Sequence, residues 1–316
     1  MKKIFFLLLA FVFTVNIATA FECNSLGSAY RRINKYAKHN NVNRLDAFLS
    51  SNSCGKDALV YYSDKLVNKC LKKDYSPQVF EVLMKHGVKL NFLAEPPIMT
   101  AIIYNEADLV KIMIDYGLDV NKTYRGQRTA LICAADYNGN PHIIKMLLDA
   151  GADVNATDSC GNTAILTLCR REPYSQGIYH LIDAGADLYS YNKRDKMPYS
   201  LLPKVRQAKV KAYYDNRMTS FLREKYIDSN KNKVIADYGI PYTKHIIDKN
   251  TEVWEYRSDI EHYLPMVSET SQSGQQSAIT VYKGGYTEKI IKKTSFTICH
   301  NAVRDVVFES RYNTGH

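Results

Sequence analysis

Side chains that catalyse reactions or bind metals occur in this sequence, but their spacing matches no catalytic or metal-binding motif. The eight histidines contain no His-x-x-x-His pair, and the seven cysteines contain no Cys-x-x-Cys pair with zinc-site spacing. Neither a Gly-x-Ser-x-Gly motif nor a phosphate-binding Gly-x-x-x-x-Gly-Lys-Ser/Thr loop is present. Cys160 precedes a glycine in an expected turn, but the sequence places no base beside its thiol. We therefore predict no catalytic residue, no cofactor and no metal site.

The first twenty residues have the pattern of a secretory signal peptide. Two lysines precede an apolar run at residues 4–15, and Ala18-Thr19-Ala20 has the small-x-small form that signal peptidase accepts. An uncleaved N-terminal anchor is the alternative, but the run is short for a membrane span and Asn16 interrupts it. We predict cleavage after Ala20, a periplasmic or secreted location, and no transmembrane span in the mature chain.

The overall composition is that of an ordinary globular protein. Hydrophobic residues make up 46% and charged residues 23% of the 316 residues, which argues against a disordered, collagen-like or multi-span membrane chain. The formal net charge is +10, and it falls to +8 when Lys2 and Lys3 leave with the signal peptide. A positive charge can attract nucleic acid or anionic membranes, but export argues against nucleic acid as a partner.

All seven cysteines follow the predicted cleavage site. In an oxidising compartment an odd number leaves at least one thiol free or bonded to another molecule. Cys23, Cys54 and Cys70 lie in one N-terminal stretch and are the disulfide candidates, with their pairing left open. Cys133 and Cys169 fall within helical patterns, and we expect both to be buried thiols.

Four segments share one pattern, an apolar helical stripe that ends at a glycine. The glycines are Gly87, Gly117, Gly151 and Gly185, which are 30, 34 and 34 residues apart. Glycine ends helices well because it adopts the left-handed conformation without a Cβ clash. Thr129 and Thr163 each precede a second, shorter helical pattern that a threonine can cap. The repeat length predicts a stack of helix pairs.

This pattern resembles the ankyrin repeat, whose Thr-Pro-Leu-His phrase corresponds here to Thr129-Ala-Leu-Ile, Thr163-Ala-Ile-Leu and Met197-Pro-Tyr-Ser. The resemblance covers residues 76–202, with degenerate repeats at 37–49 and from residue 57, and with a capping helix at 204–226. It implies a mainly α fold, an ankyrin solenoid within residues 21–222. Because the family's histidine is missing, its usual hydrogen bonds between repeats are lost, and we expect softer repeats.

In ankyrin proteins the loop before each short helix forms a finger beside that helix, and these parts together make a concave surface for a protein partner. The resemblance places these residues on that surface: Tyr124, Arg125, Arg128, Asp136, Tyr137, Asp158, Ser159, Arg170, Arg171, Tyr191, Lys193 and Arg194. Tyr and Arg often carry interface energy. A partner would then present an acidic epitope, whereas the alternative is a solvated basic edge without a function.

Residues 225–316 differ from the repeats and predict a small α+β domain with an antiparallel sheet. A short helix at 233–238 precedes strand-like runs at 252–256, 278–282, 290–298 and 303–310. The helix, the Gly239-Ile-Pro turn and Trp254-Glu-Tyr resemble the SmpA/OmlA (BamE-like) group of bacterial envelope domains. The chain lacks that group's lipidated cysteine and carries an insert at 262–277. An unrelated α+β domain is the alternative.

These resemblances imply an exported, non-enzymatic ankyrin-repeat protein that mediates protein–protein interaction in the bacterial envelope or outside the cell. Residues 225–316 would then form a second interaction or docking unit. Two alternatives are a secreted effector and a hydrolase-like enzyme with its activity in residues 225–316. The lack of a recognisable acid/base set favours the first interpretation.

Overall fold

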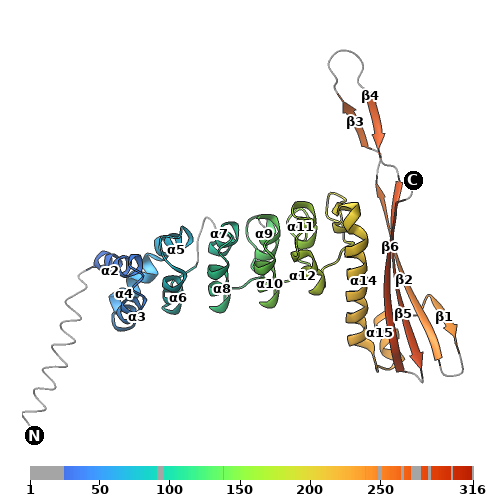
Figure 1. Cartoon of the computed structure of the whole chain (residues 1–316), viewed down its shortest axis with the longest axis horizontal. Helices are drawn as coiled ribbons and strands as arrows, with labels where there is room; N and C mark the ends of the chain where they lie inside the picture. The colour runs from blue at the N-terminus through green and yellow to red at the C-terminus, as the bar shows by residue number, and fades with distance from the viewer. Residues whose placement is uncertain are drawn as a thin grey trace, which may run out of the picture. The chain divides into compact units, whose positions relative to one another are not determined.

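Short helices recur along the first part of the chain, and antiparallel strands form its last part (Figure 1). The computed structural model describes residues 25–90, 96–137, 139–238, 240–247, 251–264, 267–271, 279–283, 286–299 and 302–314. The chain divides into two units, Met1–Ser159 and Cys160–His316. The predicted signal peptide and Cys23 lie outside the described residues. The predicted boundary near residue 222 stays a prediction.

Antiparallel helix pairs build the first unit. Its described elements are α2 (Leu26–Lys38), α3 (Val42–Ser51), α4 (Ser53–Tyr61), α5 (Ser63–Leu71), α6 (Pro77–Lys85), α7 (Pro97–Ile103), α8 (Ala107–Asp115), the 3-10 turn η1 (Arg125–Gln127), α9 (Ala130–Tyr137) and α10 (Pro141–Asp149). Helices pack within a pair, as α7 does on α8, and against the next pair, as α7 does on α9. Apolar side chains such as Phe80, Ile102 and Leu147 are fully buried between the helices.

The second helix of each repeat ends at the predicted glycine. Gly87, Gly117, Gly151 and Gly185 have φ angles of 82°, 81°, 83° and 92°. After α10 the Gly151 N–H donates to the Leu148 carbonyl at 2.9 Å, and the Ala152 N–H donates to the Leu147 carbonyl at 3.0 Å. These two bonds form a Schellman motif, which satisfies carbonyls that the helix end leaves unpaired. The glycine prediction is confirmed.

The expected helix caps are present, and one turn geometry recurs along the first unit, whereas the degenerate repeats at 37–49 and from residue 57 stay a prediction. Thr163 Oγ1 accepts a hydrogen bond from the Leu166 N–H at 3.3 Å, as an N-cap residue does. Within the first unit, Asn40 and Lys73 have φ angles of 50° and 64° in the turns between two helices. Asn105 has a φ of 59° at the corresponding turn of a later repeat. A turn with a positive φ angle between paired helices therefore also occurs in the N-terminal part of the chain, where the repeat pattern of the sequence is weakest.

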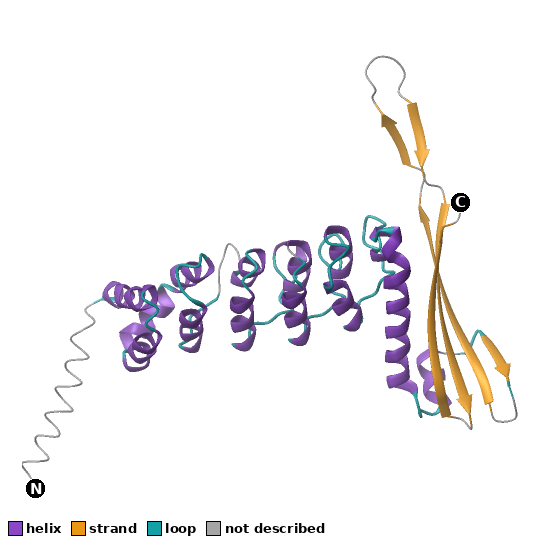
Figure 2. Cartoon of the chain, in the orientation of Figure 1, coloured by secondary structure: helices purple, strands orange, loops and turns teal. Residues whose placement is uncertain are grey.

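The second unit joins helices to a four-stranded sheet, as Figure 2 shows. Its described elements are α11 (Ala164–Arg171), α12 (Gly177–Asp183), α13 (Pro198–Leu201), α14 (Lys204–Tyr226), α15 (Lys231–Tyr238), β1 (Thr243–Ile246), β2 (Thr251–Leu264), β3 (Val267–Ser271), β4 (Ile279–Lys283), β5 (Tyr286–Cys299) and β6 (Ala302–Thr314). The sheet order is β1-β2-β5-β6 with antiparallel neighbours, and β3 pairs with β4 in a separate two-stranded sheet. The fold is thus mainly helical with a C-terminal antiparallel sheet, as predicted.

One face of the sheet forms an aromatic core with the last two helices. The core contains Tyr226, Val234, Trp254, Tyr256, Phe296, Ile298, Val303 and Val306. The Phe296 ring lies edge-on to Tyr226 at 5.2 Å and to Tyr256 at 5.7 Å between ring centroids, a favourable geometry for aromatic pairs. α14 packs along β6. Among the described residues no helix is long and apolar enough to cross a membrane.

Candidate protein-binding surface

The finger before α9 is a tight turn that projects a cationic side chain. The Tyr124 N–H donates to the Arg128 carbonyl at 3.0 Å and closes the loop. Within the turn Gly126 and Gln127 have φ angles of 77° and 57°, which glycine adopts at little cost and glutamine at some cost. Arg125 is exposed at the tip, whereas the Tyr124 ring is half-buried. The sequence had predicted both residues at this finger.

Three of the predicted residues form one cluster beside this finger. Arg128 Nη2 lies 2.7 Å from Asp136 Oδ2, and the guanidinium lies 5.5 Å from the centroid of the Tyr137 ring. The Arg128 and Asp136 side chains are partly buried, while Tyr137 is 51% exposed. The ion pair fixes the guanidinium against the ring, so the Tyr137 ring is held in place with an exposed face. A rigid aromatic side chain of this kind loses little entropy on binding.

Neighbouring fingers are joined through their backbones. In the first unit the Ser159 N–H donates to the Gly126 carbonyl at 2.8 Å, which connects the predicted residues Asp158 and Ser159 to the finger at Arg125. In the second unit the Lys193 N–H donates to the Cys160 carbonyl at 3.1 Å. The same bond thus recurs one repeat later, and it limits the movement of each finger relative to its neighbour.

The last finger depends on a buried asparagine, Asn192, which is not among the residues predicted for the surface. Asn192 Oδ1 accepts hydrogen bonds from the Arg194 and Lys196 N–H groups, both at 2.9 Å. Its Nδ2 donates to Asn162 Oδ1 at 2.6 Å. These bonds hold the exposed Lys193 and Arg194 and the half-buried Tyr191, all three predicted from the sequence. An asparagine between Tyr191 and Lys193 was the available signal, because Asn side chains commonly bond nearby backbone in turns.

The predicted residues fall into two groups, one in each unit. Tyr124, Arg125, Arg128, Asp136, Tyr137, Asp158 and Ser159 lie in the first unit, and Arg170, Arg171, Tyr191, Lys193 and Arg194 lie in the second. Arg170 and Arg171 are exposed at the C-terminal end of α11, where cations also interact favourably with the helix dipole. The structure places all twelve on α9, on α11 or on the loops before α9, α11 and α13, and their part in binding a partner stays a prediction.

Asparagine side chains form hydrogen bonds between neighbouring repeats of the first unit. Asn121 Nδ2 donates to the Gly151 carbonyl at 2.9 Å, and its Oδ1 accepts from the Asp153 N–H at 2.7 Å. Asn140 Nδ2 donates to Asn105 Oδ1 at 2.6 Å. Repeats in the first unit are thus connected by side-chain amides. The Asn121 amide thus bonds the next repeat with both its nitrogen and its oxygen.

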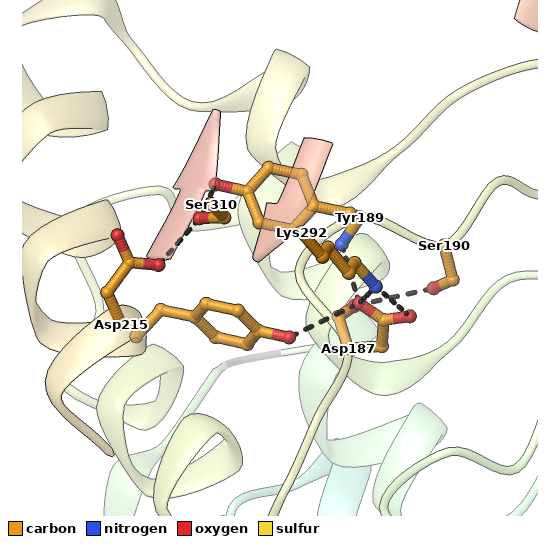
Figure 3. A network of polar contacts seen from close by, with 7 residues as sticks. Asp187, Tyr189, Ser190, Asp215, Lys292 and Ser310 are labelled. Carbon is orange, nitrogen blue, oxygen red and sulfur yellow. Dashed lines mark hydrogen bonds and ion pairs between the residues drawn. The ribbon is translucent and has the colours of Figure 1, made fainter. Parts of the chain in front are cut away.

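A network of polar side chains in the second unit was not predicted at all (Figure 3). The hydroxyl groups of Tyr189 and Ser310 lie 2.8 Å apart, and Ser310 Oγ donates to Asp215 Oδ1 at 2.6 Å. Tyr189 and Ser310 are each 1% exposed. Asp215 also forms an ion pair with Lys211. The network therefore joins the loop after α12 to α14 and to β6 with its buried hydroxyls satisfied.

The carboxylate of Asp187 completes this network (Figure 3). It accepts hydrogen bonds from the Tyr189 N–H at 2.9 Å and from the Tyr214 hydroxyl at 3.5 Å, and Lys292 Nζ lies 3.3 Å away. Burial raises the pKa of Tyr189 and of Tyr214, so both phenols stay protonated at neutral pH. The arrangement is a structural junction between a repeat and the sheet.

Burial also explains the protonation state of the cysteines that lie in helices. It raises the pKa of Cys70, Cys133 and Cys169 to about 12, so these thiols stay protonated and unreactive at neutral pH. Cys133 and Cys169 are buried thiols, as predicted. The disulfide prediction gains no support, since the described residues contain no disulfide and Cys70 is a thiol. Cys54 is likewise a thiol in the structure, and Cys23, the third candidate, lies outside the described residues.

The family comparison agrees with the helix pairs of the first unit. Residues 67–158 match the family model for ankyrin repeats (3 copies). This stretch contains ankyrin repeats, a module that suggests protein–protein interaction. A search of curated proteins gave no match to the chain. Neither comparison supports the resemblance of residues 225–316 to the SmpA/OmlA envelope domains.

Proposed function

We propose that this chain is an exported, non-enzymatic protein that binds another protein through its ankyrin fingers. The observation that carries the proposal is the cluster of Arg128, Asp136 and Tyr137. There Arg128, ion-paired with Asp136, lies against the exposed ring of Tyr137, and the finger that ends at Arg128 carries the exposed Arg125. Interfaces are enriched in Tyr and Arg because these side chains bury a large area and still donate hydrogen bonds.

Positive charge at the fingers supports a partner with an acidic epitope. Arg125, Lys193 and Arg194 are exposed at the fingers, and Arg170 and Arg171 are exposed on α11. Complementary charge speeds association and contributes to specificity, and salt screens it over about 10 Å at moderate ionic strength. Binding should therefore weaken as the salt concentration rises.

The experiment is affinity capture from bacterial envelope and secreted fractions. The bait is the chain itself, and the test variant replaces Tyr124, Arg125 and Tyr191 by Ala. The matched control replaces Lys111, an exposed cation in the middle of α8, and Tyr116, the exposed tyrosine that follows this helix. The proposal requires a partner that the parent and the control retain and the test variant loses. A partner retained equally by all three baits would rule out the fingers as the binding surface.

Export and the N-terminal disulfide are parts of the same proposal. They are supported by the signal-peptide pattern of residues 1–20 and by the grouping of Cys23, Cys54 and Cys70 in one N-terminal stretch. Intact mass of the non-reduced protein from its native compartment tests both. We expect loss of residues 1–20 and the two-hydrogen deficit of one disulfide. A mass that retains residues 1–20 would contradict export, and a full set of thiols would contradict the bond.

Residues 225–316 are proposed as an envelope-docking unit. Support comes from the resemblance in the Gly239-Ile-Pro turn and Trp254-Glu-Tyr, and from the order of a helix followed by antiparallel strands. Fractionation tests this part of the proposal. We expect the chain to be recovered with membranes. Substitutions on the surface of the sheet in residues 225–316 should release it into the soluble fraction.

A further inference from the structure

The helix α2, at the N-terminal end of the first unit, carries charge of one sign only (Figure 1). The sequence between Glu22 and Asp46 contains no acidic residue, and its cations are Arg31, Arg32, Lys35, Lys38 and Arg44. The helices α8 and α10, by contrast, each pair an exposed lysine with an aspartate four residues later. An excess of positive charge is therefore a local feature of this end of the unit.

Three of these cations form the solvent face of α2. Arg31, Lys35 and Lys38 are spaced by four and three residues, so they lie on one side of the helix, and all three are exposed. The helix packs on α3 and α4, and its buried stripe consists of Ala29, Ile33 and Ala37. Arg32 is directed toward α3, where its guanidinium lies 5.5 Å from the centroid of the Phe48 ring. We call Arg31, Lys35 and Lys38 the cationic face.

No carboxylate of the described residues lies within ion-pair distance of the cationic face, and its three side chains form no hydrogen bond there. Like charges three or four residues apart on a helix repel each other. The helix dipole favours Lys35 and Lys38 in the last turn, but Arg31 lies in the middle of α2 and does not gain from it. An anion placed against this face would remove the repulsion.

The way these cations are held favours an anionic membrane over a protein as the occupant. A specific protein interface gains from side chains that are fixed beforehand, as the ion pair with Asp136 fixes Arg128 at the finger. On the cationic face no such contact fixes the side chains. Lipid phosphates are anions spread over a plane, and they attract clustered lysines and arginines without a fixed geometry.

Aromatic side chains beside the cationic face fit the same occupant. The Tyr30 ring stacks on the Tyr62 ring with 4.2 Å between centroids, and the Tyr61 ring lies edge-on to Tyr62 at 4.9 Å. Tyr61 is 71% exposed. Tyrosine is enriched at membrane–water interfaces because its ring is apolar and its hydroxyl is polar. Since Tyr30 directly precedes Arg31, this aromatic group adjoins the cationic face.

We propose that the cationic face of α2 binds the surface of a membrane that contains anionic lipids. Its three side chains contact lipid phosphates, and Tyr61 lies at the level of the headgroups. Each lysine or arginine near such a surface strengthens binding about fivefold, so three cations give a reversible attachment. The contact uses none of the finger residues, so it does not depend on the binding of a protein partner.

Co-sedimentation of the full chain with lipid vesicles tests the proposal. The vesicles consist of phosphatidylcholine alone, or of phosphatidylcholine and phosphatidylglycerol in equal parts. The test variant replaces all three cations of the face by Gln, which is a good helix former. The matched control replaces Lys89, Lys145 and Lys209 by Gln, three exposed lysines outside the cationic face. Both variants thus lose the same charge.

We expect the parent and the control to sediment with the anionic vesicles at low salt, and neither to sediment with phosphatidylcholine alone. The test variant should bind on the order of a hundredfold more weakly, with an unchanged thermal unfolding midpoint. Salt at about 1 M should release the parent, because it screens charges beyond about 3 Å. If the test variant unfolds, Arg31→Gln replaces it, with an expected loss of about fivefold.

The variant Arg31→Lys separates attraction by charge from a fixed contact. A membrane surface attracts either cation, so this variant should bind as the parent does. A loss of binding would indicate a contact that needs the planar guanidinium and would contradict the proposal. Equal binding by the folded test variant and the parent would overturn it. So would a parent that does not bind the anionic vesicles, a result that would favour an acidic protein at this face.

Discussion

At the scale of single residues, the residue four positions after each helix-ending glycine changes its type and its hydrogen-bond partner along the repeats. The phrase after each helix-ending glycine finishes in Asn91, Asn121 and Asn155 and then in Tyr189. Asn121 bonds to the backbone of the next repeat, at Gly151 and Asp153. Tyr189 instead reaches Ser310 of β6 with its hydroxyl. The replacement of Asn by Tyr thus marks where the solenoid stops and the sheet begins.

Removal of the Tyr189 hydroxyl should weaken this junction. Tyr189→Phe keeps the buried ring and leaves Ser310 with Asp215 as its remaining partner, so we expect a loss of about 1 kcal/mol in the free energy of unfolding. Urea unfolding followed by Trp254 fluorescence measures it. Tyr213→Phe is the matched control, because the Tyr213 hydroxyl bonds Asp183 at 2.7 Å in an exposed position and should matter less. Equal midpoints for Tyr189→Phe and the parent would contradict the role of this bond.

Gly151 tests the repeat register at the same scale. A Cβ built on Gly151 meets nothing within 4 Å, so a substitution there costs backbone strain at φ 83° and no steric overlap. Gly151→Val should lower stability by about 1 kcal/mol or more, and Gly151→Asn by less, because Asn tolerates the left-handed region. Thermal unfolding distinguishes the two variants. An unchanged melting temperature in Gly151→Val would oppose the assigned helix end.

At the scale of elements, sequence periodicity predicted most of the helices and the longer strands. The glycine register gave the ends of α6, α8, α10 and α12, and the apolar runs gave β2, β5 and β6. β1 and β3 were missed because they are short and polar, with the β1 sequence Thr-Lys-His-Ile showing no clear alternation. Their pairing comes from neighbouring strands, which a local pattern does not contain.

The sequence likewise predicted one part of the candidate site, the finger residues, and missed another part, the polar network around Asp187. The finger residues follow from the repeat, because their positions are set by sequence distance from the glycines. The network of Asp187, Tyr189, Asp215, Lys292 and Ser310 could not be found, since its members are up to 123 residues apart. Each of them alone is an ordinary polar residue.

Three helices each bury a cysteine, and the free energy of unfolding should therefore fall at alkaline pH. The pKa of Cys70, Cys133 and Cys169 rises from 9.0 to about 12 on folding, because burial disfavours the thiolate. The unfolded chain ionises first, so this stability is complete below pH 9 and is lost as the pH rises toward 12. Urea midpoints at about pH 8 and about pH 10 should therefore differ, with the lower midpoint at the higher pH. A midpoint that is equal or higher at alkaline pH would contradict this assignment.

At the scale of the whole molecule, the second unit combines the helix pair α11 and α12, the long helix α14 and the sheet. Tyr189, Tyr214 and Ser310 are buried where these parts meet. A chain that ends after residue 224 would expose the two rings and lose Lys292 as a partner of Asp187. Hydrogen exchange should then increase across residues 160–202 relative to the full chain. Unchanged protection in this range would show that the repeat does not need the sheet.

Protein binding by the fingers is the central claim, and isothermal titration calorimetry with the captured partner tests it most directly. Replacement of Tyr124, Arg125 and Tyr191 by Ala should lower the affinity by more than about 2 kcal/mol, roughly thirty-fold, while the unfolding midpoint stays close to that of the parent. Replacement of Lys111 and Tyr116 should leave the affinity unchanged. A partner that binds the triple variant as tightly as the parent would contradict the claim and direct attention to residues 225–316.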